Sequence, residues 1–136
     1  TGRAVVAFPD QKGIDVSSPL TFFNGPNSAN RWTIYVHAYI TVPVPAAIVV
    51  PVDIRRIKIG PYGYLVEAEF PKIAGGAGIP VSAEMEVGHR WRHGGKRLSY
   101  LNGRCEDGKL QAKGEFVFKD GTLLRGNFLK PCSVRP

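Results

Sequence analysis

Histidines at short spacing are a frequent sign of metal binding, and His89 and His93 lie four positions apart. On a helix this spacing would place both rings over one metal ion. The surrounding residues instead alternate as in a strand and then turn at Gly94-Gly95, so we expect the two rings to lie about 13 Å apart. With His37 as the remaining histidine, we predict no metal and no cofactor.

Nucleophilic and acid–base catalysis also lack a recognisable set of residues. No serine lies in a Gly-x-Ser-x-Gly elbow. Glycosidase chemistry needs two carboxylates that face each other across a cleft. The pairs Glu67/Glu69 and Glu84/Glu86 would each lie on one face of a strand, about 7 Å apart. Alternating surface glutamates are far commoner on half-buried sheets than catalytic pairs. We therefore predict that the chain is not an enzyme.

The strongest local feature is a basic patch around one tryptophan, and it has two interpretations. The patch consists of Arg90, Trp91, Arg92, Lys96 and Arg97. Cations of this kind bind phosphate or carboxylate groups, while the indole stacks on a base or sugar. The interpretation that we favour places Trp91 in the core and leaves the arginines as a solvated rim.

A second candidate surface is the polar side of one predicted strand. In the segment 31–41, Tyr35, His37 and Tyr39 alternate with aliphatic residues. The aliphatic side is expected to be core, which leaves the tyrosines outside. Exposed aromatic rings on a flat sheet either hold sugar rings or mark a protein interface.

The two cysteines, Cys105 and Cys132, flank a predicted hairpin. An even pair in a basic chain rich in glycine and proline is typical of a disulfide in an exported protein, and we predict that bond. The other interpretation is two buried free thiols in a cytosolic protein. Cys-x-x-Cys spacing, which zinc ribbons and thioredoxin-like motifs require, does not occur.

The elements that carry these residues belong to an all-β protein. The 136 residues, with 43% hydrophobic and 21% charged side chains, predict a single domain over 1–136. No apolar run reaches the 18 or so residues of a membrane helix. The start at Thr1 is expected for a processed chain or a fragment. The net charge of +7 favours anionic partners in a general way.

Apolar and polar residues alternate between turn residues along most of the chain, which predicts strands. We expect strands at 4–8, 20–23, 31–41, 54–59, 64–70, 82–91, 97–101, 109–118 and 122–129. The prolines at 43, 45 and 51 predict that 42–52 is an edge strand or a crossover between sheets. The segment 71–80 is expected to be a loop, because its Ala74-Gly75-Gly76-Ala77-Gly78 stretch is too small and flexible to pack as an element. The predicted fold is an antiparallel β-sandwich of jelly-roll or immunoglobulin-like type, with a closed β-barrel as the alternative.

The C-terminal part of the chain resembles a known group of proteins. The resemblance rests on Ser99-Tyr100-Leu101, Cys105, Asp107-Gly108-Lys109-Leu110, Ala112, Gly114, Phe116, Phe118-Lys119-Asp120-Gly121-Thr122, Gly126 and Pro131-Cys132, with Pro71-Lys72-Ile73-Ala74-Gly75-Gly76 upstream. The chain is similar over about half its length to uncharacterised exported proteins of actinobacterial type. This resemblance implies export, a disulfide and an all-β fold, and it implies no activity. The stretch 108–128 is also similar to one MORN repeat.

Three classes of function fit these observations, and we rank them. The first is a secreted or cell-surface structural or adhesive module that binds protein or itself. The second is a carbohydrate-binding module that uses Tyr35 and Tyr39. The third is a binder of nucleic acid or another anionic polymer that uses Arg90 and Arg92.

Overall fold

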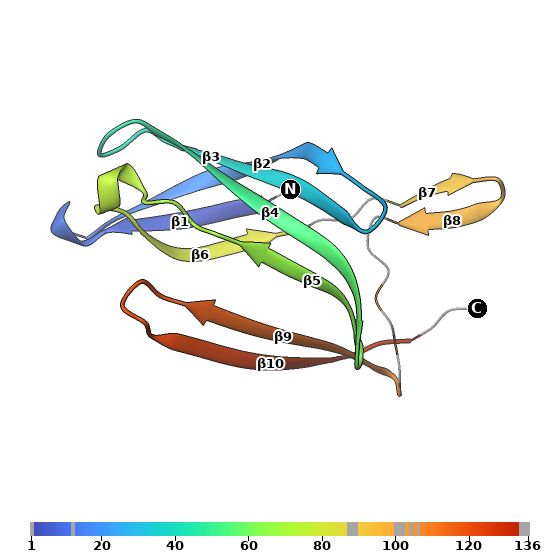
Figure 1. Cartoon of the computed structure of the whole chain (residues 1–136). Coiled ribbons are helices and arrows are strands. Elements are labelled where there is room, and N and C mark those ends of the chain that lie inside the picture. The colour runs from blue at the N-terminus through green and yellow to red at the C-terminus, as the bar shows by residue number, and fades with distance from the viewer. Residues whose placement is uncertain are drawn as a thin grey trace.

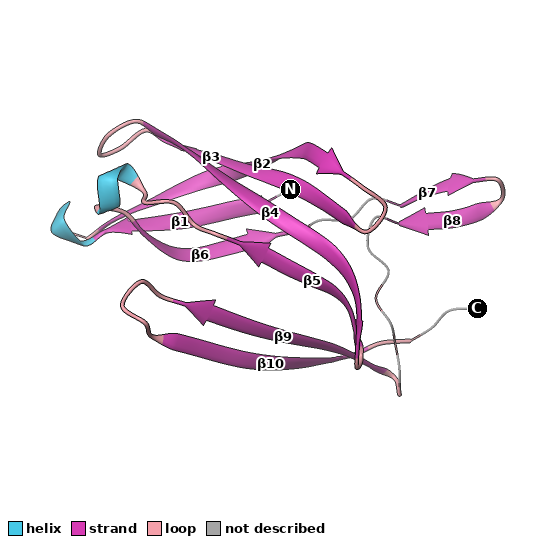
Figure 2. Ribbon diagram, viewed as in Figure 1, coloured by secondary structure: helices cyan, strands magenta, loops and turns pink. Residues whose placement is uncertain are grey.

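A computed structural model shows an antiparallel all-β protein with two short 3₁₀ turns (Figures 1 and 2). It describes residues 2–11, 13–86, 90–99, 103, 105 and 107–133. The strands are β1 (Gly2–Phe8), β2 (Ile14–Asn27), β3 (Arg31–Ile40), β4 (Ala46–Ile59), β5 (Tyr62–Ala68), β6 (Ile79–Met85), β7 (Arg90–His93), β8 (Lys96–Ser99), β9 (Lys109–Val117) and β10 (Leu123–Pro131), and the 3₁₀ turns are η1 (Pro9–Gln11) and η2 (Ala74–Gly76).

Six strands form one curled sheet in the order β5-β4-β3-β2-β1-β6. The core lies on the inner face of this sheet, because alternate side chains of each strand point to the same side. The buried members of the core are Val6, Phe8, Val36, Ala38, Ile40, Ile48, Val50 and Ile73. The apolar side of the predicted strand 31–41 is therefore core, as expected, and its tyrosine side faces outward.

The prediction for 42–52 was wrong. Residues 46–59 form β4, which lies between β3 and β5 inside the sheet and pairs with β3 from Ile40↔Ala46 to Arg31↔Arg55. The apolar alternation of Ile48 and Val50 places both side chains in the core. Their burial outweighs the proline penalty, so the segment is neither an edge strand nor a crossover.

Pro51 fits in β4 because its nitrogen, which carries no hydrogen to donate, points to the side where β5 has already ended. The backbone N–H and C=O of Tyr39 point toward β2, where they meet Ser18. Backbone groups alternate in direction along a strand, so the N–H and C=O of Tyr35 also point toward β2. Tyr35 and Pro51, which lie opposite each other in β3 and β4, therefore exchange no hydrogen bond. The nitrogen of Pro51 thus faces β5, which ends at Ala68, one pair short of it.

The connection between β5 and β6 joins the two edges of the sheet, and it packs against the core. Ile73 is 5% exposed and belongs to the core cluster. Its backbone bridges to Gly78 around η2. The expected loop therefore ends at Gly78, where β6 follows, and it includes the 3₁₀ turn η2. Ile73, just before the glycine-rich stretch, is an apolar anchor in the core.

Two separate hairpins follow the sheet. The pair β7–β8 turns at Gly94-Gly95, and β9–β10 pairs in continuous register from Pro131↔Lys109 to Leu123↔Val117. Both hairpins were predicted. The long strand expected at 82–91 is divided, since β6 ends at Met85 and β7 starts at Arg90, and His89 lies outside the described residues.

The structure confirms the all-β antiparallel class. Its curled six-stranded sheet resembles half of a barrel, and a sandwich of two packed sheets is not directly confirmed. In Figure 1, β9–β10 lies below β5 and β6 as a separate layer. Within the described ranges, no helix is long and apolar enough to cross a membrane.

Candidate functional site

The predicted aromatic face lies on the outer side of the six-stranded sheet. Tyr35 and Tyr39 are exposed and His37 is half-buried. Sequence analysis did not include Phe23 of β2, which is exposed and lies edge-on to His37 with ring centroids 6.3 Å apart. Pairing of Phe23 with Tyr35 across the β2–β3 ladder brings these rings into one row.

A glycine holds the ring of Tyr35 close to the sheet. A Cβ atom on Gly25 would lie 2.8 Å from Cε2 of Tyr35, inside van der Waals contact. The ring therefore lies along the backbone of β2, while Phe23 and Tyr39 remain more accessible. Such a row suits stacking on sugar rings or on another protein, and sugar recognition stays a prediction.

The same outer face ends in a network of charged residues. Thr33 Oγ1 donates to Asp53 Oδ1 at 2.6 Å, and Arg31 donates to Asp53 Oδ2 at 2.8 Å. These two hydrogen bonds, with that of Thr33 the larger influence, hold the pKa of Asp53 below its usual value. Arg55 pairs with Glu67 beside them, so this end of the face is locally neutral.

The basic patch lies on the β7–β8 hairpin. The register pairs Arg92 with Arg97 and Arg90 with Ser99, so the three arginines share one face of the hairpin. Trp91 is on the other face with Leu98, and both are exposed. The favoured interpretation of Trp91 as a core residue was therefore wrong, because β7 lies outside the six-stranded sheet. Lys96 is directly opposite His93, on the tryptophan side.

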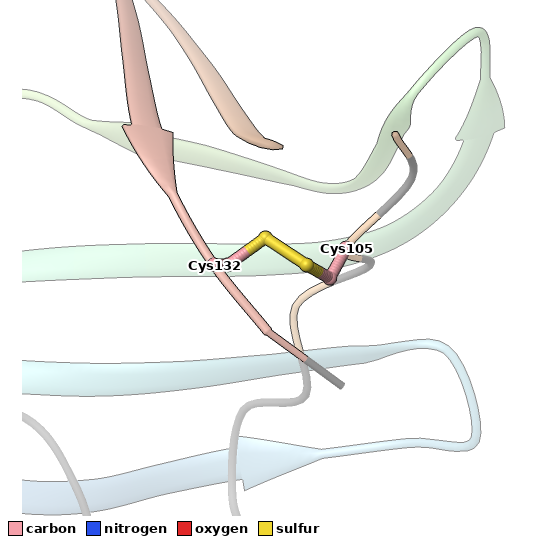
Figure 3. The surroundings of a disulfide bond; sticks show 2 residues. All are labelled: Cys105 and Cys132. Carbon is pink, nitrogen blue, oxygen red and sulfur yellow. A yellow bond between two sulfur atoms is a disulfide. The ribbon is translucent and has the colours of Figure 1, made fainter. Parts of the chain in front are cut away.

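The predicted disulfide joins Cys105 and Cys132 at the base of β9–β10 (Figure 3). The backbone N–H of Cys132 also donates to the carbonyl oxygen of Gly108 at 2.9 Å. Asp107 and Gly108 have positive φ values of 53° and 70°, which turn the chain sharply into β9. The disulfide and this hydrogen bond thus hold the start of β9 and the end of β10 together.

Sequence analysis missed one apolar surface, which lies on the β9–β10 hairpin. Register places alternate residues of β9 and β10 on one side of the hairpin, which we call the hairpin face. It consists of Leu110, Ala112, Gly114, Phe116, Leu124, Gly126 and Phe128, with Lys130 at its base. The aromatic members and Leu124 are 57 to 64% exposed. The alternation was visible in the sequence, but only the hairpin was predicted from it, and its apolar face was not singled out.

The opposite side of the same hairpin carries most of its charged residues, together with the exposed Val117, Leu123 and Leu129. Glu115 lies 2.8 Å from the Lys113 ammonium and 3.3 Å from Arg125 Nε. The hydrogen bond from Lys113 is the larger of the influences that lower the pKa of Glu115. The charges of the hairpin are therefore concentrated on this side, and the hairpin face is the more apolar of the two.

The predicted glutamate pairs lie beside two shallow, open hollows. One, of about 430 Å³, is lined by Gly2, Arg3, Glu84, Met85 and Glu86. The other, of about 310 Å³, is lined by Pro51, Asp53, Glu67, Ala68 and Glu69. Over the part of the chain that the structure describes, no three His, Cys, Asp or Glu residues gather as a metal site would require.

No protein-family model matches the chain, and neither the curated proteins nor the solved structures include a match.

Proposed function

We propose that this protein is a non-catalytic, exported structural or adhesive module that associates with copies of itself. The observation that supports this most directly is its accessible surface of 10,784 Å². A compact monomer of 14.9 kDa would expose roughly 7,000 Å². Permanent interfaces bury about 1,000 to 2,500 Å² of each partner, so the excess of about 3,800 Å² on one chain is more than enough for such an interface.

The location of the surplus surface also supports association. The hairpin β7–β8 projects from the curled sheet and β9–β10 lies below it as a separate layer (Figure 1), and the hairpin face is apolar. Large apolar patches are rare on monomeric soluble proteins and mark interaction sites. The disulfide supports export, because such bonds persist in oxidising compartments.

Light scattering on the purified, oxidised protein tests this proposal. We expect a mass of at least two chains at micromolar concentration, with dissociation on dilution. A constant mass of 14.9 kDa at every concentration would contradict it. Small-angle scattering on the same samples should show that each chain in the assembly exposes less surface than the isolated chain does.

Binding of an anionic polymer is the second candidate, and one observation favours it. Arg90, Arg92 and Arg97 share a face of β7–β8, and the segment 90–99 contains no acidic residue. Binding through such a face should weaken steeply as salt rises. Arg92→Ala should reduce that slope on heparin or single-stranded DNA, whereas Lys96→Ala, on the other face, should change it less. Equal slopes for both variants would contradict this candidate.

A further inference from the structure

We infer that the hairpin face is a dimer interface, and that it packs against the same face of a second copy of this chain. This inference rests on the proposed self-association and names the contact that produces it. The second copy would lie with its β9–β10 stacked on the first, related by a two-fold axis near the Gly114↔Gly126 pair.

The first argument is that a two-stranded hairpin is marginally stable in water unless its apolar side is covered. In the described residues, β9 and β10 form a sheet of their own and extend no other one. The exposed fractions of Phe116, Leu124 and Phe128 are 57%, 58% and 64%. The regular nine-residue register of the hairpin is therefore best explained by a partner that covers this side.

The second argument is the flatness of the hairpin face. Gly114 and Gly126 are directly opposite each other in the ladder. A Cβ atom on Gly126 would lie 3.3 Å from the ring of Phe128, and one on Gly114 would lie 3.6 Å from the ring of Phe116. Each ring thus lies over a glycine instead of standing upright. Two flat faces of this kind can stack as sheets do, about 10 Å apart.

The third argument is electrostatic, since two chains of net charge +7 repel each other. The charges of this hairpin are mostly on its other side, where Lys113 and Arg125 share Glu115. The hairpin face itself carries Lys130 near its base, opposite Leu110. Two copies can therefore approach through this face with little buried charge. A symmetric pair also needs only one self-complementary surface.

The chain offers matched substitutions for the test. Phe128 and Leu129 are adjacent, are 64% and 65% exposed, and point to opposite sides of β10. Phe128→Lys would place a charge in the contact, while Leu129→Lys would place it in solvent. Light scattering over a dilution series should show at least about a 30-fold weaker dimer for Phe128→Lys, as expected for a central contact. Leu129→Lys should dimerise as the unaltered protein does.

Mixing variants separates this contact from other dimers. If Phe128 meets Phe128 of the second copy near the axis, an equimolar mixture of Phe128→Lys and Phe128→Glu should restore a dimer that neither variant forms alone. An assembly that persists in Phe128→Lys would overturn this contact while leaving self-association intact. A monomeric unaltered protein would overturn both. A monomeric protein that Phe128→Lys destabilises would show instead that the chain's own sheet covers the face.

Discussion

The hydroxyl of Ser18 replaces a backbone group that Pro19 cannot supply to Tyr39. The ladder between β2 and β3 sets Pro19 opposite Tyr39, one step beyond Leu20↔Ala38. Ser18 Oγ accepts from the Tyr39 nitrogen at 3.1 Å and lies 3.0 Å from the Tyr39 carbonyl oxygen, to which it can donate. Ser18 is 1% exposed. A buried side chain thus maintains the connection between two strands where a proline interrupts it.

Ser18→Ala should destabilise the sheet by about 1 to 3 kcal/mol, because it leaves the backbone groups of Tyr39 without their partner. Urea unfolding followed by circular dichroism measures the effect. The matched control is Ser17→Ala, since Ser17 is exposed on the other face of β2 and should change stability by less than about 0.5 kcal/mol. Equal effects would show that the hydroxyl has no special role.

Sequence patterns predicted the strands well wherever alternation and turn residues agreed. The segment 31–41 and the hairpin at 109–129 are examples, since their alternating faces and glycine turns point to the same structure. The prolines misled the prediction for 42–52, because a proline is tolerated in β4 once its partner strand has ended at Ala68. The rule that proline belongs at the edge of a sheet considers only the proline, and it takes no account of where the neighbouring strand ends.

The candidate sites were harder to predict, for a physical reason. Alternation shows which residues share a side of a strand, but not what covers that side. The tyrosine face was correctly placed outside because the aliphatic side of β3 is core. Trp91 was assigned to the core and the hairpin face was not singled out, and the strands that carry both lie outside the six-stranded sheet. Tertiary packing decides such cases, and no local pattern encodes it.

Gly25→Ala should displace the ring of Tyr35 and destabilise the protein by about 1 to 3 kcal/mol. The new Cβ would lie 2.8 Å from Cε2 of Tyr35 and 3.0 Å from the carbonyl oxygen of Thr33. Thermal unfolding measures the cost. Gly63→Ala is the control, because a Cβ there meets nothing within 4 Å. If Tyr35→Ala does not reduce the cost of Gly25→Ala, the ring is not the obstacle.

The stability of the sheet should fall on acidification through Asp53. Because hydrogen bonds from Thr33 and Arg31 lower the pKa of Asp53 in the folded state, its ionised form adds stability above the unfolded pKa of about 4. That contribution is lost as the pH falls through the lower, folded pKa. Urea midpoints between pH 6 and pH 2 should therefore decline less in Asp53→Asn than in the unaltered protein.

The hydroxyl of Thr33 provides the control for this pH dependence. Thr33→Val removes the donor that lies 2.6 Å from Asp53, so the pKa of Asp53 measured by NMR should rise. Thr33→Ser retains a donor and should keep the pKa low. Identical pKa values in the two variants would assign the effect to Arg31 alone.

Reduction of Cys105–Cys132 should loosen the C-terminal hairpin and leave the six-stranded sheet intact. The cysteines are 27 residues apart, and closing a loop of that length contributes roughly 3 to 4 kcal/mol in the chain-entropy model. Hydrogen exchange should accelerate in β9 and β10 of a Cys105→Ser/Cys132→Ser variant, while β3 and β4 keep their protection. Uniform acceleration across both regions would show that hairpin and sheet unfold together.

Ile73→Ala should destabilise the protein far more than a residue in a glycine-rich connection would suggest. Its side chain is 5% exposed and packs in the core cluster, so the truncation should cost about 2 to 5 kcal/mol. Ile79→Ala is the matched control, because Ile79 is 52% exposed and should cost less than about 1 kcal/mol. Chemical denaturation of both variants compares them directly. Similar midpoints would mean that the connection between β5 and β6 adds no stability of its own. A large difference would mean that Ile73 anchors this connection, and with it the two edge strands, to the core.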